Sequence, residues 1–229
     1  MTARIDKPRT VNRQVLADHV YQEVLASLMD GRLMAGAGIS IDGLARELDV
    51  SPTPVREALA RLEATGMVRR VALKGYSVAP LFSAEDLAQL MDARLVIEPV
   101  NAFRACERRT PALNQALAQA ITDLRTAPRG VSFAEFREYW EADERFHRLI
   151  AESSGNQFIL SAYNSLGGQV QRFRFFSGLG VTDAECAIEE HTAIFDAFTA
   201  GDPKQAQRAM VAHISGVKQR AVKDVADHA

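Results

Sequence analysis

The pattern of the sequence changes at Pro80, and this change constrains the fold more than any other feature. Before Pro80, short apolar stripes with helical spacing precede two short strand-like segments around Lys74-Gly75. After Pro80, helical periodicity continues to the end of the chain, interrupted only by proline- and glycine-containing breaks. Six helices are expected there, at residues 83–107, 111–126, 132–153, 156–177, 182–200 and 203–225. The sequence therefore predicts a mainly α protein in which a small domain (residues 13–80) precedes an all-helical, six-helix antiparallel bundle (residues 81–229).

Composition narrows the class of protein further. The chain has 229 residues, 47% of them hydrophobic and 24% charged, with a net charge of −2, which is ordinary for a globular protein. No apolar run reaches the roughly 18 residues of a membrane span, and the N-terminus lacks the apolar core of a signal peptide. Cys106 and Cys186 lie far apart, so a disulfide framework is not expected. These features favour a cytoplasmic protein, with polar residues 1–12 as a flexible arm.

Residues 13–80 carry the signals of a winged helix-turn-helix. A helix is expected from about Arg13 to Leu33, and Ser40 is a suitable N-cap for a second, short helix. Ser51 is a suitable N-cap for a third helix, in which Pro52 takes the first position, where its missing N–H costs nothing. Gly66 ends the third helix, and two short strands follow at residues 67–71 and 76–79. Three helices and a two-stranded wing in this order are typical of a DNA-binding module.

The third helix is expected to present a polar face to DNA. Its apolar stripe, Val55, Ala58, Leu59 and Leu62, packs into the module and leaves the opposite face free. Arg56 there can grip guanine O6 and N7 with its two-pronged fork, and the wing can reach phosphates or the minor groove. The alternative is that these are ordinary solvated side chains. The candidate DNA-contacting residues are Ser51, Thr53, Arg56 and Arg61 on the helix, and Arg69, Arg70, Lys74 and Gly75 on the wing.

The same segment resembles a known family. The run LARELDVSPTPVREAL at residues 44–59, followed by Arg61-Leu62-Glu63-Ala64 and Gly66, is similar to the signature of the GntR family of transcriptional regulators. The resemblance covers about residues 15–80. The family usually has an arginine where this chain has Pro52, and commonly Pro-Gly where it has Ala35-Gly36. The first departure removes one expected DNA contact, so an operator sequence does not transfer from the family to this chain.

The bundle contains a candidate metal site. Asp143 and His147 are spaced i, i+4 and share one face of a helix, while His191 and His213 each lie in an otherwise apolar stretch. Inward-pointing side chains from three helices can supply three nitrogens and one oxygen, which suit zinc, nickel, iron or manganese. The alternative is that each histidine is a hydrogen-bonded core residue.

A second resemblance concerns this bundle. Asp143-Glu144-Arg145-Phe146-His147, Ser154-Gly155-Asn156, Glu190-His191, Gly201-Asp202 and Ala212-His213 are similar to the FCD effector-binding domain of FadR-type GntR proteins. In many members the matching Asp and three His bind a divalent metal, for which zinc is the first expectation here.

The resemblance also implies an effector site. Arg94 lies in a stretch similar to the family's first bundle helix, where an arginine often faces the effector, and its guanidinium matches a carboxylate. Tyr139 and Arg172 are further candidates for this pocket. An ion pair of Arg94 with Glu98 at i, i+4 is the alternative.

Together these features lead to one functional hypothesis and two rivals. The hypothesis is a homodimeric DNA-binding regulator that acts on a palindromic operator and is controlled by a small carboxylate effector at the metal site, with repression as the first expectation and activation as the alternative. The first rival is a regulator for which the metal ion itself is the signal. The second is a metal-dependent enzyme, but the chain offers no nucleophile with its base, and an enzyme leaves the DNA-binding module unexplained.

Overall fold

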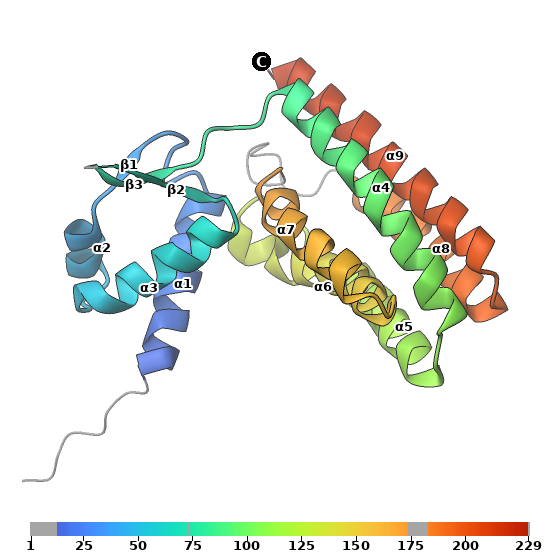
Figure 1. The fold of residues 1–229 in the computed structure, drawn as a ribbon. Coiled ribbons are helices and arrows are strands. Elements are labelled where there is room, and N and C mark those ends of the chain that lie inside the picture. Colours follow the sequence, from blue (N-terminus) through green and yellow to red (C-terminus); the bar gives the residue numbers. More distant parts are fainter. Residues whose placement is uncertain (1–12, 73, 174–182, 229) are drawn as a thin grey trace, which may run out of the picture. The chain divides into compact units, whose positions relative to one another are not determined.

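The computed structural model describes residues 13–72, 74–173 and 183–228 and divides the chain at Pro80 into two compact units, Met1–Pro80 and Leu81–Ala229 (Figure 1). The predicted arm at residues 1–12 lies outside the described residues. None of the helices in the described part of the chain combines the length and the apolar character that a membrane span requires.

The first unit is a winged helix-turn-helix, as predicted. Its helices are α1 (Arg13–Met29), α2 (Ile41–Glu47) and α3 (Pro52–Ala64), and its strands are β1 (Gly38–Ile39), β2 (Val68–Val71) and β3 (Gly75–Val78). The strands form an antiparallel sheet in the order β1-β3-β2. The two-residue strand β1 was not predicted, because it exists only through its pairing with β3.

Local chemistry sets the bounds of these helices. Ser40 caps α2 by accepting a hydrogen bond at 3.0 Å from the backbone N–H of Gly43. Asp49 adopts a left-handed backbone (φ 51°) in the tight turn before α3. The first helix was predicted to run to about Leu33 but ends at Met29, because Gly31 takes φ 69°, a left-handed conformation that stops a helix.

The core of the first unit is apolar. Val55, Ala58, Leu59 and Leu62 are each 0% exposed, so the predicted stripe is the buried face of α3. It packs against α1, α2 and β2. The opposite face of α3 is consequently turned outward.

The second unit contains six helices in the described residues. They are α4 (Ala84–Glu107), α5 (Pro111–Thr126), α6 (Phe133–Ser153), α7 (Gln157–Phe173), α8 (Ala184–Ala200) and α9 (Pro203–His228). Their bounds follow local signals: Ser83 and Asp86 form a capping box before α4, proline opens α5 and α9, and Gly201 ends α8 with φ 71°. Residues 174–177, which the sequence assigned to the fourth bundle helix, lie outside the described residues.

Helices α4 and α9 run alongside each other through the bundle (Figure 1). Helix α8 packs on α5 and α9, and helix α6 packs on α4, α5 and α7. Their facing sides form an apolar core that includes Met91, Phe146, Ile194, Phe198 and Ile214. A group of charged and polar side chains is buried within this packing.

Candidate metal centre and nucleic-acid interface

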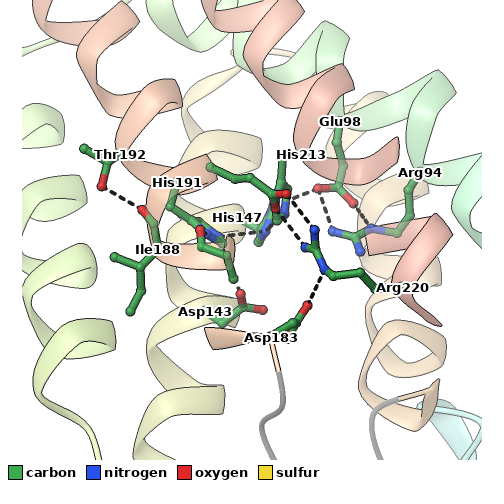
Figure 2. A network of polar contacts seen from close by, with 12 residues as sticks. Arg94, Glu98, Asp143, His147, Asp183, Ile188, His191, Thr192, His213 and Arg220 are labelled. Atoms are coloured by element: carbon green, nitrogen blue, oxygen red, sulfur yellow. Dashed lines mark hydrogen bonds and ion pairs between the residues drawn. The ribbon is translucent and has the colours of Figure 1, made fainter. Parts of the chain in front are cut away.

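Three histidines from three helices meet inside the bundle (Figure 2). His147 on α6, His191 on α8 and His213 on α9 are 5%, 0% and 1% exposed. The Nε2 atom of His147 lies 3.2 Å from the Nε2 atom of His191 and 3.2 Å from that of His213. Asp143, one helical turn before His147, has its Oδ1 atom 3.5 Å from His191 Nε2. The structure thus brings together the four side chains singled out in the sequence.

The outer nitrogen of each imidazole faces an acceptor. His147 Nδ1 lies 2.8 Å from Glu98 Oε2, His213 Nδ1 lies 2.8 Å from Glu190 Oε2, and His191 Nδ1 lies 2.5 Å from the Ala187 carbonyl oxygen. Because carboxylate and carbonyl oxygens only accept, the hydrogen bonds place a proton on Nδ1 of His191 and His213, and the 2.8 Å approach of the Glu98 carboxylate favours the same tautomer of His147. The three Nε2 atoms therefore face one another as lone pairs.

Electrostatics favour neutral imidazoles in this cluster. Burial, followed by the neighbouring His213, lowers the pKa of His191 well below its ordinary value. Burial also lowers the pKa of His213, although its hydrogen bond to Glu190 acts in the opposite direction. Both rings are therefore uncharged near neutral pH and can act as ligands.

The cluster fits a divalent metal ion. Two nitrogens bound at about 2.0–2.1 Å in a tetrahedral zinc site lie about 3.3–3.4 Å apart, close to the separations seen here. Three buried lone pairs that converge without a proton between them repel one another unless a cation lies among them. Three imidazoles and a carboxylate are also a donor set that zinc, nickel, iron and manganese accept.

The proposed effector residues are only partly brought together. Arg94 on α4 is 3% exposed and contacts Glu98 through Nε and Nη2, at 2.5 and 3.3 Å. The ion pair considered as an alternative therefore exists, but it is buried directly beside His147. Tyr139 is fully buried one turn before Asp143 and packs in a small cluster with Leu124, Ala142, Ala184 and Ile188. The side chain of Arg172 lies outside the described residues.

Sequence reasoning missed four side chains around this cluster. Glu98 was considered only as a partner of Arg94, although it also contacts His147. Glu190 and Arg220 are joined across α8 and α9, 30 residues apart, so no helical spacing connects them. Tyr163 on α7 is buried, and that burial, with the charges of Glu98, Glu144 and Asp143, raises its pKa well above the usual value.

The outward face of α3 presents most of the residues expected to contact DNA. Ser51, Thr53 and Arg56 are exposed. Arg61 is also exposed, but its Nη1 atom lies 2.5 Å from Asp18 Oδ1 and its guanidinium lies 4.2 Å from the ring centroid of Tyr21. This arginine therefore links α3 to α1, and part of its charge is engaged inside the module.

The wing is open to solvent. Arg69 and Arg70 on β2 are exposed, as are Lys74 and Gly75 at the turn into β3. Val68 and Val78, paired across the two strands, anchor the wing by their burial. The basic side chains are thus carried on a short hairpin, β2 and β3, of the module's sheet.

Comparisons with known proteins place both units in described families. Residues 16–78 match the model of bacterial regulatory proteins of the gntR family, and residues 89–216 match the FCD domain. This chain belongs to the GntR family of transcriptional regulators, in the group that carries an FCD domain. It is therefore a transcriptional regulator and not an enzyme, so the enzymatic rival falls away.

Full-length relatives agree with this assignment. The chain is 28% identical to the HTH-type transcriptional regulator YcbG of Bacillus subtilis strain 168, over 95% of this chain and 94% of the relative. It is 24% identical to the HTH-type transcriptional repressor RspR of Escherichia coli K12, over 94% and 91%. The solved structure of E. coli McbR/YncC shares the fold, with a TM-score of 0.72 at 19% identity, covering 91% of this chain and 97% of that one.

Proposed function

We propose that this regulator is a homodimeric repressor that binds a palindromic operator and releases it when a small carboxylate binds at a metal site in the bundle. The observation that carries the proposal is the convergence of three Nε2 atoms and the Asp143 carboxylate in the core. The proposed ligands are Asp143, His147, His191 and His213, with zinc as the first candidate and nickel, iron or manganese as alternatives.

Exposure and charge support the DNA-binding half of the proposal. Ser51, Thr53 and Arg56 lie at the start of α3, the end that enters the major groove in this class of module. The wing residues Arg69, Arg70, Lys74 and Gly75 are accessible to backbone phosphates. The name of the RspR relative supports repression as the direction of control.

The charge balance of the core supports an anionic effector. Glu98 is neutralised by Arg94, and Glu190 is neutralised by Arg220. A divalent ion held by Asp143 and three neutral imidazoles would then keep a net positive charge at the site, and expansion from four to five ligands would let it bind a carboxylate oxygen. Arg94 is the candidate to bind the other carboxylate oxygen, because the one described partner of its Nη1 atom is Met91 Sδ at 3.6 Å. Tyr139 and Arg172 are further proposed pocket residues.

Helix α4 is the proposed route from effector to DNA. It carries Arg94 and Glu98, and only residues 79–83 separate its start from the end of β3 in the wing. A carboxylate that draws Arg94 away from Glu98 changes what holds α4 against α6. For this to control binding, the effector must have different affinities for the DNA-competent and DNA-incompetent states.

The test combines metal analysis with DNA binding. The protein is purified without chelator, its metal content is measured by mass spectrometry, and its affinity for its own promoter fragment is titrated at several salt concentrations. We expect about one divalent ion per chain, salt-sensitive DNA binding and one class of small carboxylate that weakens it about 5–150-fold. His191→Ala should lose the metal and the carboxylate response while still binding DNA.

A matched control and two outcomes make the test decisive. His19→Ala removes an exposed histidine of α1 and should retain the metal. Full metal occupancy in His191→Ala would refute the ligand assignment. DNA affinity that follows metal concentration alone, and ignores every carboxylate, would identify the ion itself as the signal.

A further inference from the structure

Two of the three histidines are held by the same arrangement of side chains, each made of a histidine, a glutamate and an arginine (Figure 2). In the first, Glu98 Oε2 lies 2.8 Å from His147 Nδ1, and the carboxylate accepts from the Nε and Nη2 atoms of Arg94 at 2.5 and 3.3 Å. The three residues come from α4 and α6. The glutamate thus joins an imidazole to a guanidinium.

The second arrangement repeats the first on other helices. Glu190 accepts from His213 Nδ1 at 2.8 Å and from the Nη1 and Nη2 atoms of Arg220 at 2.8 and 3.0 Å. Arg220 is in turn held through its Nε atom by Asp183 Oδ2 at 2.9 Å. In both arrangements the arginine neutralises the carboxylate, so that a charged group can stay next to the imidazole in the interior.

Helix α9 leaves room for the second arrangement at Gly216. This glycine lies between His213 and Arg220 on α9, and a Cβ atom added there would come within 2.6 Å of Glu190 Oε1 and 2.9 Å of Arg220 Nη1. A glycine inside a helix costs about 1 kcal/mol relative to alanine. Here the missing side chain provides the space in which Glu190 reaches across to α9.

We infer that Glu98 and Glu190 are positioning residues of the metal site, which fix the ring orientation and tautomer of His147 and His213 so that both Nε2 lone pairs point at the ion. This inference rests on the proposed metal site. A carboxylate behind a ligating imidazole holds the proton on the far nitrogen and makes the near nitrogen a stronger donor. His191 has only the Ala187 carbonyl in that place, so the two carboxylates act on the other two ligands.

Glu190 allows the cleaner test, because its side chain is 23% exposed whereas that of Glu98 is 4% exposed. Zinc affinity of the full chain is measured by competition with a chelator, and the site geometry is compared through the visible spectrum of the cobalt-substituted protein. We expect Glu190→Ala to weaken zinc binding about 10–100-fold and to alter the cobalt spectrum. Glu190→Gln should recover part of the loss, since its amide oxygen still accepts from Nδ1.

Two measurements separate positioning from a merely structural ion pair. Glu189→Ala removes the exposed neighbouring carboxylate of α8 and should bind zinc like the unmodified chain. In the metal-free protein, nitrogen NMR of His213 should show the proton on Nδ1, and Glu190→Ala should shift it toward a mixture of tautomers. The inference is overturned if Glu190→Ala binds zinc as tightly as Glu189→Ala with an unchanged cobalt spectrum.

The variant Gly216→Ala provides an independent test. Because alanine favours the helix, the melting temperature of the metal-free protein should not fall, yet zinc affinity should decrease as Glu190 is displaced. Unchanged zinc affinity in this variant counts against positioning by Glu190 when nitrogen NMR of the metal-free variant shows the mixture of His213 tautomers that displacement of Glu190 predicts. If the unmodified chain itself binds no zinc, cobalt, nickel or manganese, the proposed metal site has failed first, which is distinguishable from failure of Glu190 alone.

Discussion

The winged module and the bundle keep their functional chemistry in opposite places. Among the described residues, the buried charged and polar side chains all belong to the bundle: Arg94, Glu98, Asn101, Asp143, His147, Ser154, His191 and His213. In the winged module the buried described side chains are apolar, and the arginines proposed to contact DNA are exposed. A DNA reader can keep its charges in water until it binds, whereas a sensor that encloses its ligand needs charged groups in the core, each with a partner.

Two ion pairs show this difference at matched geometry. Arg94–Glu98 in the bundle and Arg61–Asp18 in the module each have a closest N–O distance of 2.5 Å. The side chains of the first pair are 3% and 4% exposed, and those of the second are 48% and 54% exposed. The closest contact distance is the same, but the first pair is buried, and its Glu98 carboxylate has a second contact with Arg94 and one with His147. Burial and these added contacts together should make the first pair the costlier one to break.

The largest effect is expected from breaking the buried pair. Glu98→Ala leaves the Arg94 guanidinium charged and without its carboxylate in the core, which typically costs about 3–5 kcal/mol. Urea unfolding of the metal-free protein, followed through the fluorescence of Trp140, the single tryptophan, measures this loss in the bundle. Glu107→Ala, at an exposed site on the same helix, is the control. A loss below about 1 kcal/mol, the range of exposed ion pairs, would show that burial does not increase the cost of breaking this pair.

The next largest effect is expected at an exposed arginine of the winged module. Arg56→Ala should weaken binding to the operator by about 1–3 kcal/mol, as expected for loss of a bidentate base contact. The stability of this variant to urea should equal that of the unmodified chain, because Arg56 is exposed. Fluorescence anisotropy at constant salt gives the affinity, and Arg137→Ala, an exposed arginine of α6, is the matched charge control. Unchanged affinity would remove Arg56 from the interface.

Most of the fold follows from local signals that the sequence displays. Ser83 with Asp86, Pro111 and Gly201 mark helix ends through capping, missing N–H groups and left-handed backbone, all of which act within one turn. Strand β1 escapes such reasoning, because two residues have no pattern of their own and are ordered by β3. The first helix was predicted too long, since its apolar spacing continues past the glycine that ends it.

The candidate site was only partly predictable. The spacing of Asp143 and His147, with the family resemblance, led to the four proposed ligands. The glutamates behind the histidines were not foreseen, because a carboxylate on a helix ordinarily faces water and only packing reveals its partner. Arg94 and Glu98 were visible as an i, i+4 pair, but burial next to His147 is a property of three helices together.

Lowering the pH should destabilise the bundle more than the winged module, by less than the effects of the substitutions above. Burial lowers the pKa of His191 in the folded protein. Between about pH 6.5 and this lower folded pKa the unfolded chain binds more protons, so the free energy of unfolding decreases as the pH is lowered. Burial alone would raise the pKa of Glu190, but His213 and Arg220 lower it to about 2, which adds a loss in the same direction below about pH 4.5. The expected slope is about 1.4 kcal/mol per pH unit for each proton.

The module serves as the internal reference for this pH dependence. Burial raises the pKa of Tyr21, opposed by Arg61, so this group affects stability only above about pH 10. Hydrogen exchange of metal-free protein at pH 7.5 and 5.5, corrected for intrinsic exchange rates, should show lower protection at pH 5.5 in the helices of the bundle and little change in α1 and α3. Equal loss in both units would contradict the assignment of the acid sensitivity to the buried histidines.

The smallest effect is expected from breaking the exposed pair. Asp18→Ala leaves Arg61 in water and over the Tyr21 ring, so the cost should stay below about 1 kcal/mol and shrink as salt is added. Hydrogen exchange of peptides from α1 and α3 measures it inside the intact chain. If this loss equals that of Glu98→Ala, solvent exposure does not determine the cost of breaking an ion pair in this chain. The contrast between exposed charges in the module and buried charges in the bundle would then be wrong.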